Sequence, residues 1–169
     1  MRNVKPRELT MKSFHPYGNF AKMVDPAPRG IIIGERPIEF FRDMVPLRTG
    51  VHGVLMFSVN RVAKRPMVID VSEYHNYCGE GMLPLDGDIL MHVGPATPGG
   101  EVPLDDIEVF RVPKGTFVAL DPAIWHHASF PYQCDEVNVL VVLPERTYEN
   151  DCHVVQLKES DHIKIIENS

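Results

Sequence analysis

Four side chains of this sequence could together hold a divalent metal ion: Glu73, His75, Glu80 and His126. Glu73 and His75 stand two positions apart, so on a β-strand both would lie on the same face. Two imidazole nitrogens and two carboxylate oxygens suit Zn, Mn, Fe(II), Co or Ni, whereas Ca and Mg prefer oxygen alone. A buried Glu–His pair without a metal would satisfy the same groups, and it stays open as the alternative.

The residues before Glu73 indicate that this pair lies inside the fold. The odd positions of this segment are apolar: Met67, Ile69 and Val71. Polar residues such as Asp70 and Ser72 stand at even positions, so the odd positions form the apolar face of a strand. Glu73 and His75 continue that face, where the pattern calls for aliphatic side chains. Burying them without partners would cost several kcal/mol, so we expect compensating groups nearby.

The stretch IWHHASF contains two adjacent histidines, His126 and His127. If the stretch is a strand, their imidazoles point to opposite faces. The row of His126 also holds Ile124 and Phe130 and is the more apolar row. This predicts that His126 points inward toward Glu73, and that His127 faces the other side in a supporting or interface role.

Short strands are the elements that must position these groups. Fifteen prolines and twelve glycines separate stretches rich in Val, Ile, Phe and Met, a pattern typical of an antiparallel sandwich or barrel. Only the region around Thr10 to Phe14 looks helical, with Thr10 as its cap. The predicted strands are roughly 29–34, 52–60, 67–75, 80–85, 88–94, 106–111, 116–120, 124–131, 137–143 and 152–157.

Composition limits the classes of function. With 169 residues, of which 44% are hydrophobic, the chain can bury one sizeable core, so we expect a single domain over 1–169. A net charge of −6 gives no reason to expect a nucleic-acid partner, although local arginines could still bind a small anion. The longest aliphatic runs fall short of a signal peptide or a membrane span, which predicts a cytoplasmic protein with no membrane partner. Three cysteines without Cys-x-x-Cys spacing favour reduced thiols over disulfides or a zinc knuckle.

The spacing of the candidate ligands resembles the first cupin motif. In that motif two ligands two apart on a strand are followed by a glutamate and then by a turn glycine, positions that Glu73, His75, Glu80 and Gly87 match here. Glu73 replaces the first histidine of the motif. The resemblance implies an all-β, cupin-like double-stranded β-helix, or jelly-roll barrel, here with a short N-terminal helix.

Most of the chain resembles the ureidoglycolate lyase (ureidoglycolate hydrolase) family, cupin-like enzymes of allantoin and purine catabolism. The segments that carry this resemblance are LTMKSFHPYGNF, SVNRVAKRPMVIDVSEYH, MLPLDGD, AIWHHASF and NDCHVVQL. Relatives usually have Pro where this chain has Ala128, and commonly Gln where it has Glu80, and the segment 36–48 does not match cleanly. The resemblance implies a homodimer that cleaves ureidoglycolate to glyoxylate and urea with a divalent metal, a carbon–nitrogen lyase acting on a small anionic hydroxy acid.

The resemblance also implies roles for individual residues. The two histidines and two glutamates named above would hold the metal, and one carboxylate, Glu73, could also act as a base. Asn60 and Arg61, in the matching Asn-Arg segment, could clamp the substrate carboxylate, although a solvated loop charge is the alternative for Arg61. Tyr77 could supply a proton, and His127 could orient a neighbour or meet the dimer partner.

Two other functions fit the same barrel. The first is a cupin isomerase or epimerase that acts on a sugar acid or another hydroxy acid. The second is a non-catalytic cupin that binds a carboxylic acid, which would show tight binding without turnover.

Overall fold

Short strands dominate the structure, a computed structural model that describes residues 1–24, 26, 31–35, 38–51 and 53–166. The larger sheet has five strands, and all of its pairs are antiparallel. Its order is β3 (Gly18–Lys22), β12 (Thr116–Leu120), β9 (Gly81–Pro84), β14 (Glu136–Pro144) and β6 (Leu55–Ala63).

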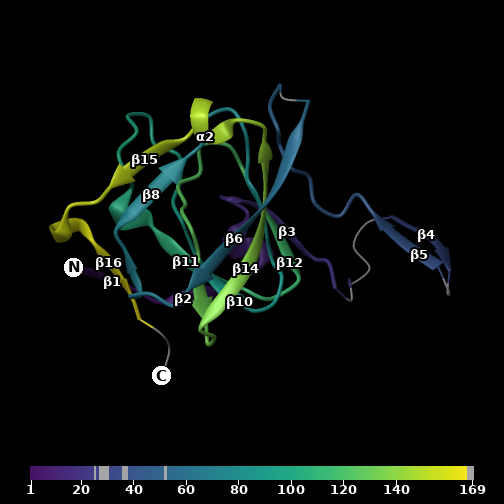
Figure 1. Ribbon diagram of the computed structural model, residues 1–169, viewed down its shortest axis with the longest axis horizontal. Coiled ribbons are helices and arrows are strands. Elements are labelled where there is room, and N and C mark those ends of the chain that lie inside the picture. Colours follow the sequence, from purple (N-terminus) through teal and green to yellow (C-terminus); the bar gives the residue numbers. More distant parts are fainter. Residues whose placement is uncertain (25, 27–30, 36–37, 52, 167–169) are drawn as a thin grey trace.

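A four-stranded sheet forms the other wall of the barrel (Figure 1). Its order is β13 (Phe130–Tyr132), β10 (Asp88–Val93), β11 (Glu108–Val112) and β2 (Pro6–Glu8). Only the pairing of β11 with β2 is parallel in this sheet.

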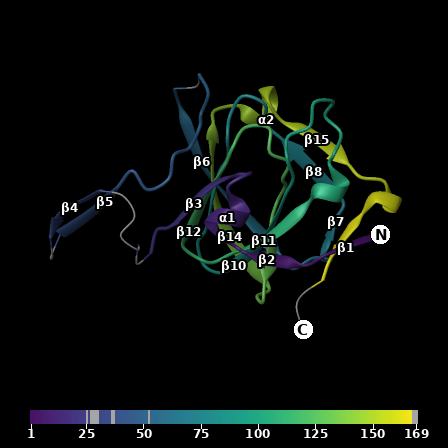
Figure 2. The same cartoon turned by 180° about the vertical axis from the view of Figure 1, so that it is seen from behind.

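Three smaller sheets and four short helices complete the described part of the chain. The sheets are β1 (Arg2–Val4) with β16 (Ile163–Ile165) and β7 (Val68–Ile69), β8 (Val71–Tyr74) with β15 (His153–Gln156), and β4 (Ile31–Glu35) with β5 (Ile38–Arg42). The helices are α1 (Met11–Phe14), α2 (Thr147–Asn150) and the 3-10 helices η1 (Leu104–Asp106) and η2 (Glu159–Asp161). The β4–β5 hairpin extends away from the barrel in both views (Figures 1 and 2).

Strand β10 is buried on both faces and so separates two apolar clusters. Ile89, Met91 and Val93 face the first cluster, which fills the barrel, whereas Leu90 belongs to the second cluster, under β7 and β16. A strand that is covered on both faces usually has a continuous run of apolar residues, and the segment ILMHV of β10 is such a run with one polar residue. The exception is His92.

Helix α1 begins as the sequence predicts. The Thr10 hydroxyl accepts from the Ser13 N–H at 3.1 Å, and the Ser13 hydroxyl accepts from the Thr10 N–H at 3.3 Å, which is a reciprocal cap. Phe14 is fully buried and meets the Phe110 ring edge-on, with ring centroids 5.3 Å apart. The prediction of an all-β fold of short, mostly antiparallel strands with a short N-terminal helix is confirmed.

Two predicted strands differ from the structure. The segment 124–131 is not a continuous strand: Trp125 and His126 form isolated bridges to Gly94 and Glu73, and β13 begins only at Phe130. A turn with Ala123 at a φ of 65° precedes these bridges, so the regular alternation of faces is lost. The predicted strand 67–75 divides at Asp70 into β7 and β8, which pair with different partners.

Several strands were not predicted: β1, β2, β3, β5 and β16. They are at most five residues long, too short for alternation to identify them. Parts of the predicted strands 29–34 and 52–60 lie outside the described residues. None of the helices in the described ranges has the length and apolarity needed to cross a membrane.

Candidate metal centre

Backbone pairing brings together the two segments that carry the candidate ligands. The Glu73 N–H donates to the His126 carbonyl at 2.6 Å, and the His126 N–H donates to the Glu73 carbonyl at 2.9 Å. Glu73 belongs to β8, and His75 follows directly after that strand. The bridge therefore fixes His126 opposite the end of β8.

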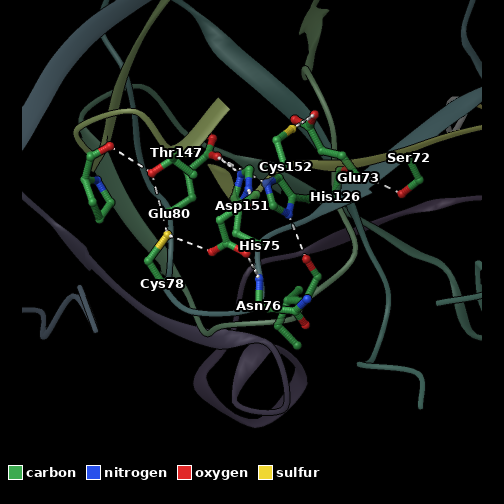
Figure 3. Close-up of polar contacts among 12 residues, drawn as sticks. Ser72, Glu73, His75, Asn76, Cys78, Glu80, His126, Thr147, Asp151 and Cys152 are labelled. Atoms are coloured by element: carbon green, nitrogen blue, oxygen red, sulfur yellow. Dashed lines mark hydrogen bonds and ion pairs between the residues drawn. The ribbon is translucent and has the colours of Figure 1, made fainter. Parts of the chain in front are cut away.

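Two imidazoles converge on one carboxylate. Nε2 of His75 lies 3.1 Å from Oε2 of Glu80, and Nε2 of His126 lies 3.2 Å from the same oxygen. Figure 3 shows the three side chains together, and all of them are buried. The expected convergence of His75, Glu80 and His126 is thus present in the fold.

The other nitrogen of each ring fixes its tautomer. Nδ1 of His75 is 2.7 Å from the Asp151 carbonyl oxygen, and Nδ1 of His126 is 2.8 Å from the Ile124 carbonyl oxygen. A carbonyl only accepts, so each Nδ1 carries a proton, and in the neutral ring Nε2 carries the lone pair. Metal-binding histidines are usually oriented in this way, which makes the donor set suitable for a metal ion.

The charges of the site agree with that geometry. Burial would raise the pKa of Glu80, but the charge and hydrogen bond of His126, followed by those of His75, outweigh it and lower this pKa to about 2. Burial would lower the pKa of His126, but Glu80 outweighs it, so this pKa is raised. The centre thus holds a buried carboxylate anion that attracts positive charge, which a proton or a metal cation can supply.

Glu73 completes the candidate ligand group at the edge of the buried region. Single ligand atoms of Glu73, His75 and His126 lie within 4.8 Å of one another, so these residues could hold a metal ion. The Cys152 thiol donates to Oε2 of Glu73 over 3.3 Å. Burial, and then the charge of Glu73, raise the pKa of Cys152 to about 12, so this sulfur keeps its proton.

Asp151 supports His75 twice, and the sequence reasoning missed it. Besides its carbonyl contact with Nδ1, its buried carboxylate accepts the N–H groups of Asn76 and Tyr77, each at 2.8 Å. These bonds hold the turn that follows His75. The only sequence signal was the NDCHVVQL segment, which supported the family resemblance but indicated no contact with His75.

A second support lies behind His126. The Ser72 hydroxyl donates to the His126 carbonyl at 3.2 Å and lies 3.1 Å from Nε2 of His92. Because Ser72 has only one proton to give, Nε2 of His92 donates to it, and Nδ1 of His92 is left as a bare acceptor. That Nδ1 is buried and has no hydrogen-bond partner in the part of the chain that the structure describes.

A cavity of about 180 Å³ opens beside the candidate ligands. Residues that line it include Asn60, Glu73, Glu80, His127, Ser129 and Tyr148. The expectation that His127 faces away from Glu73 is therefore wrong. The segment is not a strand, so adjacent histidines there need not point to opposite faces.

Asn60 and Arg61, the substrate clamp that the sequence suggested, are neighbours on β6. Asn60 lines this cavity, but Arg61 contacts Oδ1 of Asn138 at 3.3 Å and Oε1 of Glu136 at 3.7 Å and is not a lining residue. The two therefore do not form a joint clamp.

Tyr77 is 69% exposed and does not line the cavity either. A different phenol, that of Tyr148, lines it, and the Tyr148 ring stands edge-on to His75 with centroids 6.3 Å apart. Sequence reasoning missed Tyr148 because it lies on α2, far along the chain from the ligand motif.

One of the comparisons with known proteins identifies a family. A family model described as ureidoglycolate lyase matches residues 1–164 of the chain. A search of curated proteins finds no match.

Similar solved structures include an oxalate decarboxylase from Bacillus subtilis, studied for its Mn(II) centres, and an arginine-to-alanine mutant of that enzyme. Each is 16% identical to this chain, with a TM-score of 0.43 over 61% of it. The chain spans 24% of the length of these structures.

Proposed function

The chain belongs to the ureidoglycolate lyase family, and we propose that it cleaves ureidoglycolate to glyoxylate and urea with the help of a divalent transition-metal ion. The observation that carries the proposal is the convergence of the Nε2 atoms of His75 and His126 on the Glu80 carboxylate. With Glu73 nearby, these residues would hold Ni, Mn, Zn, Fe or Co.

When bound, the metal ion supplies Lewis-acid polarisation of the substrate's oxygen atoms. The reaction itself is the collapse of a carbinol-urea: the hydroxyl loses its proton, a C=O bond forms, and the C–N bond to urea breaks. The departing nitrogen takes up a proton. The protein must therefore accept one proton and donate another within the cavity.

Glu73 is our candidate for the base. Its carboxylate lines the cavity, and its contact with Cys152 engages Oε2, which leaves Oε1 for the substrate hydroxyl. Tyr148 is our candidate for the acid, in the role that the sequence suggested for Tyr77, because its phenol lines the same cavity and keeps a proton at neutral pH. His127 and Asn60 line the same cavity, and we assign them to hydrogen-bond the urea group.

Assembly into a homodimer is part of the proposal. Asn60 of β6 faces the metal cavity, so the alternate residues Leu55, Phe57 and Val59 face the other side of the sheet, where they are 36%, 68% and 59% exposed. We call these three residues the β6 apolar surface. An exposed apolar row on an edge strand favours coverage by a second chain. The family supports a role in allantoin catabolism, which we place in the cytoplasm.

Direct assay tests the proposal. Protein loaded separately with Ni, Mn, Zn, Fe(II) or Co should release urea and glyoxylate in equal amounts from ureidoglycolate, and the His126→Ala variant should not. No acceleration with any of these metals would exclude ureidoglycolate as the substrate. Exchange of the substrate C–H without release of fragments would instead indicate an isomerase or epimerase.

A further inference from the structure

The metal cavity lacks a cation that could bind the carboxylate of the proposed substrate. Its charged lining groups among the described residues include Glu73 and Glu80 but no lysine or arginine. An organic anion entering a site that already holds carboxylates needs a positive partner, and one metal ion must also offset its own acidic ligands. Arg61, the candidate from the sequence, lies outside the lining.

A second cavity, also of about 180 Å³, adjoins the first and has an arginine in its lining. The two cavities share Val141 and Tyr148 as lining residues. Met56 and Ser58, on the same face of β6 as Asn60, line the second cavity, and Arg146 is its charged lining residue among those described. Arg146, an exposed residue, therefore shares this second cavity with Tyr148, which also lines the metal cavity.

The backbone of Arg146 is held in an unusual conformation. Its φ of 59° and ψ of 22° lie in the left-handed region, which residues other than glycine seldom adopt. The Arg146 carbonyl accepts the N–H groups of Glu149 at 3.1 Å and Asn150 at 3.0 Å, and the same turn leads on to Asp151, which orients His75. The turn thus couples the position of Arg146 to that of a candidate metal ligand.

The guanidinium of Arg146 is also available to bind a ligand. It forms no hydrogen bond or ion pair with any residue of the described ranges, whereas Arg48 and Arg111 pair with Asp121 and Asp88. A planar guanidinium with free N–H groups suits a carboxylate, which it can bind through two parallel hydrogen bonds.

We propose that Arg146 binds the substrate carboxylate from the second cavity and selects anionic 2-hydroxy acids over their neutral analogues. This inference rests on the proposed function, because it assigns the anionic end of that substrate. It makes Arg146 a binding residue, whereas proton transfer stays with groups of the first cavity.

The test compares a carboxylate with its neutral amide on metal-loaded protein. Glycolate and glycolamide differ only in that group, and their dissociation constants can be measured by calorimetry. Arg146→Gln removes the positive charge, and Arg146→Lys keeps the charge but lacks the planar pair of N–H donors. Arg146→Gly removes the whole side chain, and glycine tolerates the left-handed backbone. Lys12→Ala, an exposed change on α1 that lines neither cavity, is the charge-matched control.

Wild-type protein and Lys12→Ala should prefer glycolate to glycolamide. Arg146→Gln and Arg146→Gly should weaken glycolate binding by about 10- to 100-fold, with little effect on glycolamide and with unchanged metal content. Arg146→Lys should fall between them. Equal glycolate affinity in wild type and Arg146→Gln, or equal losses for both probes, would overturn the inference.

Failure of the proposed function is distinguishable from failure of this inference. Wild-type protein could fail to cleave ureidoglycolate and still prefer glycolate to glycolamide, with that preference lost in the Arg146→Gln variant. In that case the carboxylate site stands and only the reaction is wrong. If ureidoglycolate is cleaved with the same KM by wild type and Arg146→Gln, the reaction stands and Arg146 does not bind the substrate.

Discussion

At the scale of single residues, the adjacent histidines His126 and His127 differ in what each ring nitrogen contacts. Both nitrogens of His126 are engaged, by the Ile124 carbonyl and by Glu80, and the side chain is buried. His127 lines the cavity instead, and burial, which outweighs the charge of Glu73, lowers its pKa and so favours the neutral ring. We therefore propose that His126 holds the metal and that His127 contacts the substrate.

Substituting each histidine in turn should separate the two roles. His126→Ala removes a ligand atom, so the purified protein should lose its metal and its activity together. His127→Ala should keep the metal and lower kcat/KM by about tenfold, the expected effect of losing one hydrogen bond to the substrate. Metal analysis and steady-state kinetics check both, and metal loss in His127→Ala with metal retained in His126→Ala would contradict the assignment.

Glu80 should make the stability of the folded protein depend on pH in the acidic range. In the unfolded chain it titrates near its ordinary 4.5, and in the folded, metal-free protein near 2, so between these values the unfolded chain binds more protons. The stability from this carboxylate, on the order of 3 kcal/mol, is fully present above pH 4.5 and is lost as the pH falls toward 2. Urea unfolding at several pH values should show the free energy of unfolding decreasing as the pH falls from 4.5 to 2, and this decrease is the slope compared below.

The slope should be reduced in Glu80→Gln, whatever the absolute stability of that variant. Glu159→Gln, an exposed change on η2, should keep the wild-type slope and is the matched control. An identical slope in Glu80→Gln and wild type would show that Glu80 is not ionised in the folded protein as described.

At the scale of elements, the segment from α2 to β15 connects the candidate metal centre to both cavities. Tyr148 on α2 lies against His75, Asp151 ends the helix, and Cys152 contacts Glu73. A four-residue helix has little stability of its own, so its place depends on these tertiary contacts.

Asp151→Ala should therefore weaken metal binding without removing a ligand. The backbone carbonyl of residue 151 remains, but the N–H groups of Asn76 and Tyr77 lose their buried acceptor, so the turn after His75 is released. We expect metal affinity to fall by about 10- to 100-fold, measured by competition with a chelator. Glu149→Ala, an exposed change on the same helix, should bind metal as wild type does, and equal affinity in Asp151→Ala would argue against this support.

At the scale of the whole molecule, two features lie outside the barrel that holds the centre. The β4–β5 hairpin extends from the barrel (Figure 1). The β6 apolar surface lies on the face of β6 opposite Asn60, which lines the metal cavity. Both present exposed apolar side chains, among them Phe40 and Phe57. Such surfaces favour association with a second chain.

A charge on the β6 apolar surface should disrupt the proposed homodimer. Phe57→Asp places a carboxylate at a position that is 68% exposed in the single chain, so a folded monomer can accommodate it. Sedimentation velocity should report a dimer for wild type and a monomer for Phe57→Asp. Val154→Asp, at another exposed apolar position, on β15, should remain dimeric, and a wild type that sediments as a monomer would contradict the proposal.

The sequence by itself determined the class of fold, the cap of α1 and the candidate ligand set, because these follow from spacing within short segments and from residue chemistry. Pro and Gly positions mark the strands, and Thr10 and Ser13 lie close enough in sequence to cap one another. The convergence of His75, Glu80 and His126 could be inferred because their chemistry demands partners when buried.

Tertiary structure alone decided which way the groups outside regular strands point. The turn at Ala123 ended the alternation that would have set His127 apart, and α2, distant in sequence, brought Tyr148, Asp151 and Arg146 to the centre and its neighbouring cavity. Alternation holds only while a strand is continuous, and contacts between distant segments depend on how the whole chain packs. That is why Arg61, which the sequence favoured, lies outside the cavity, and why Arg146 was found only in the fold.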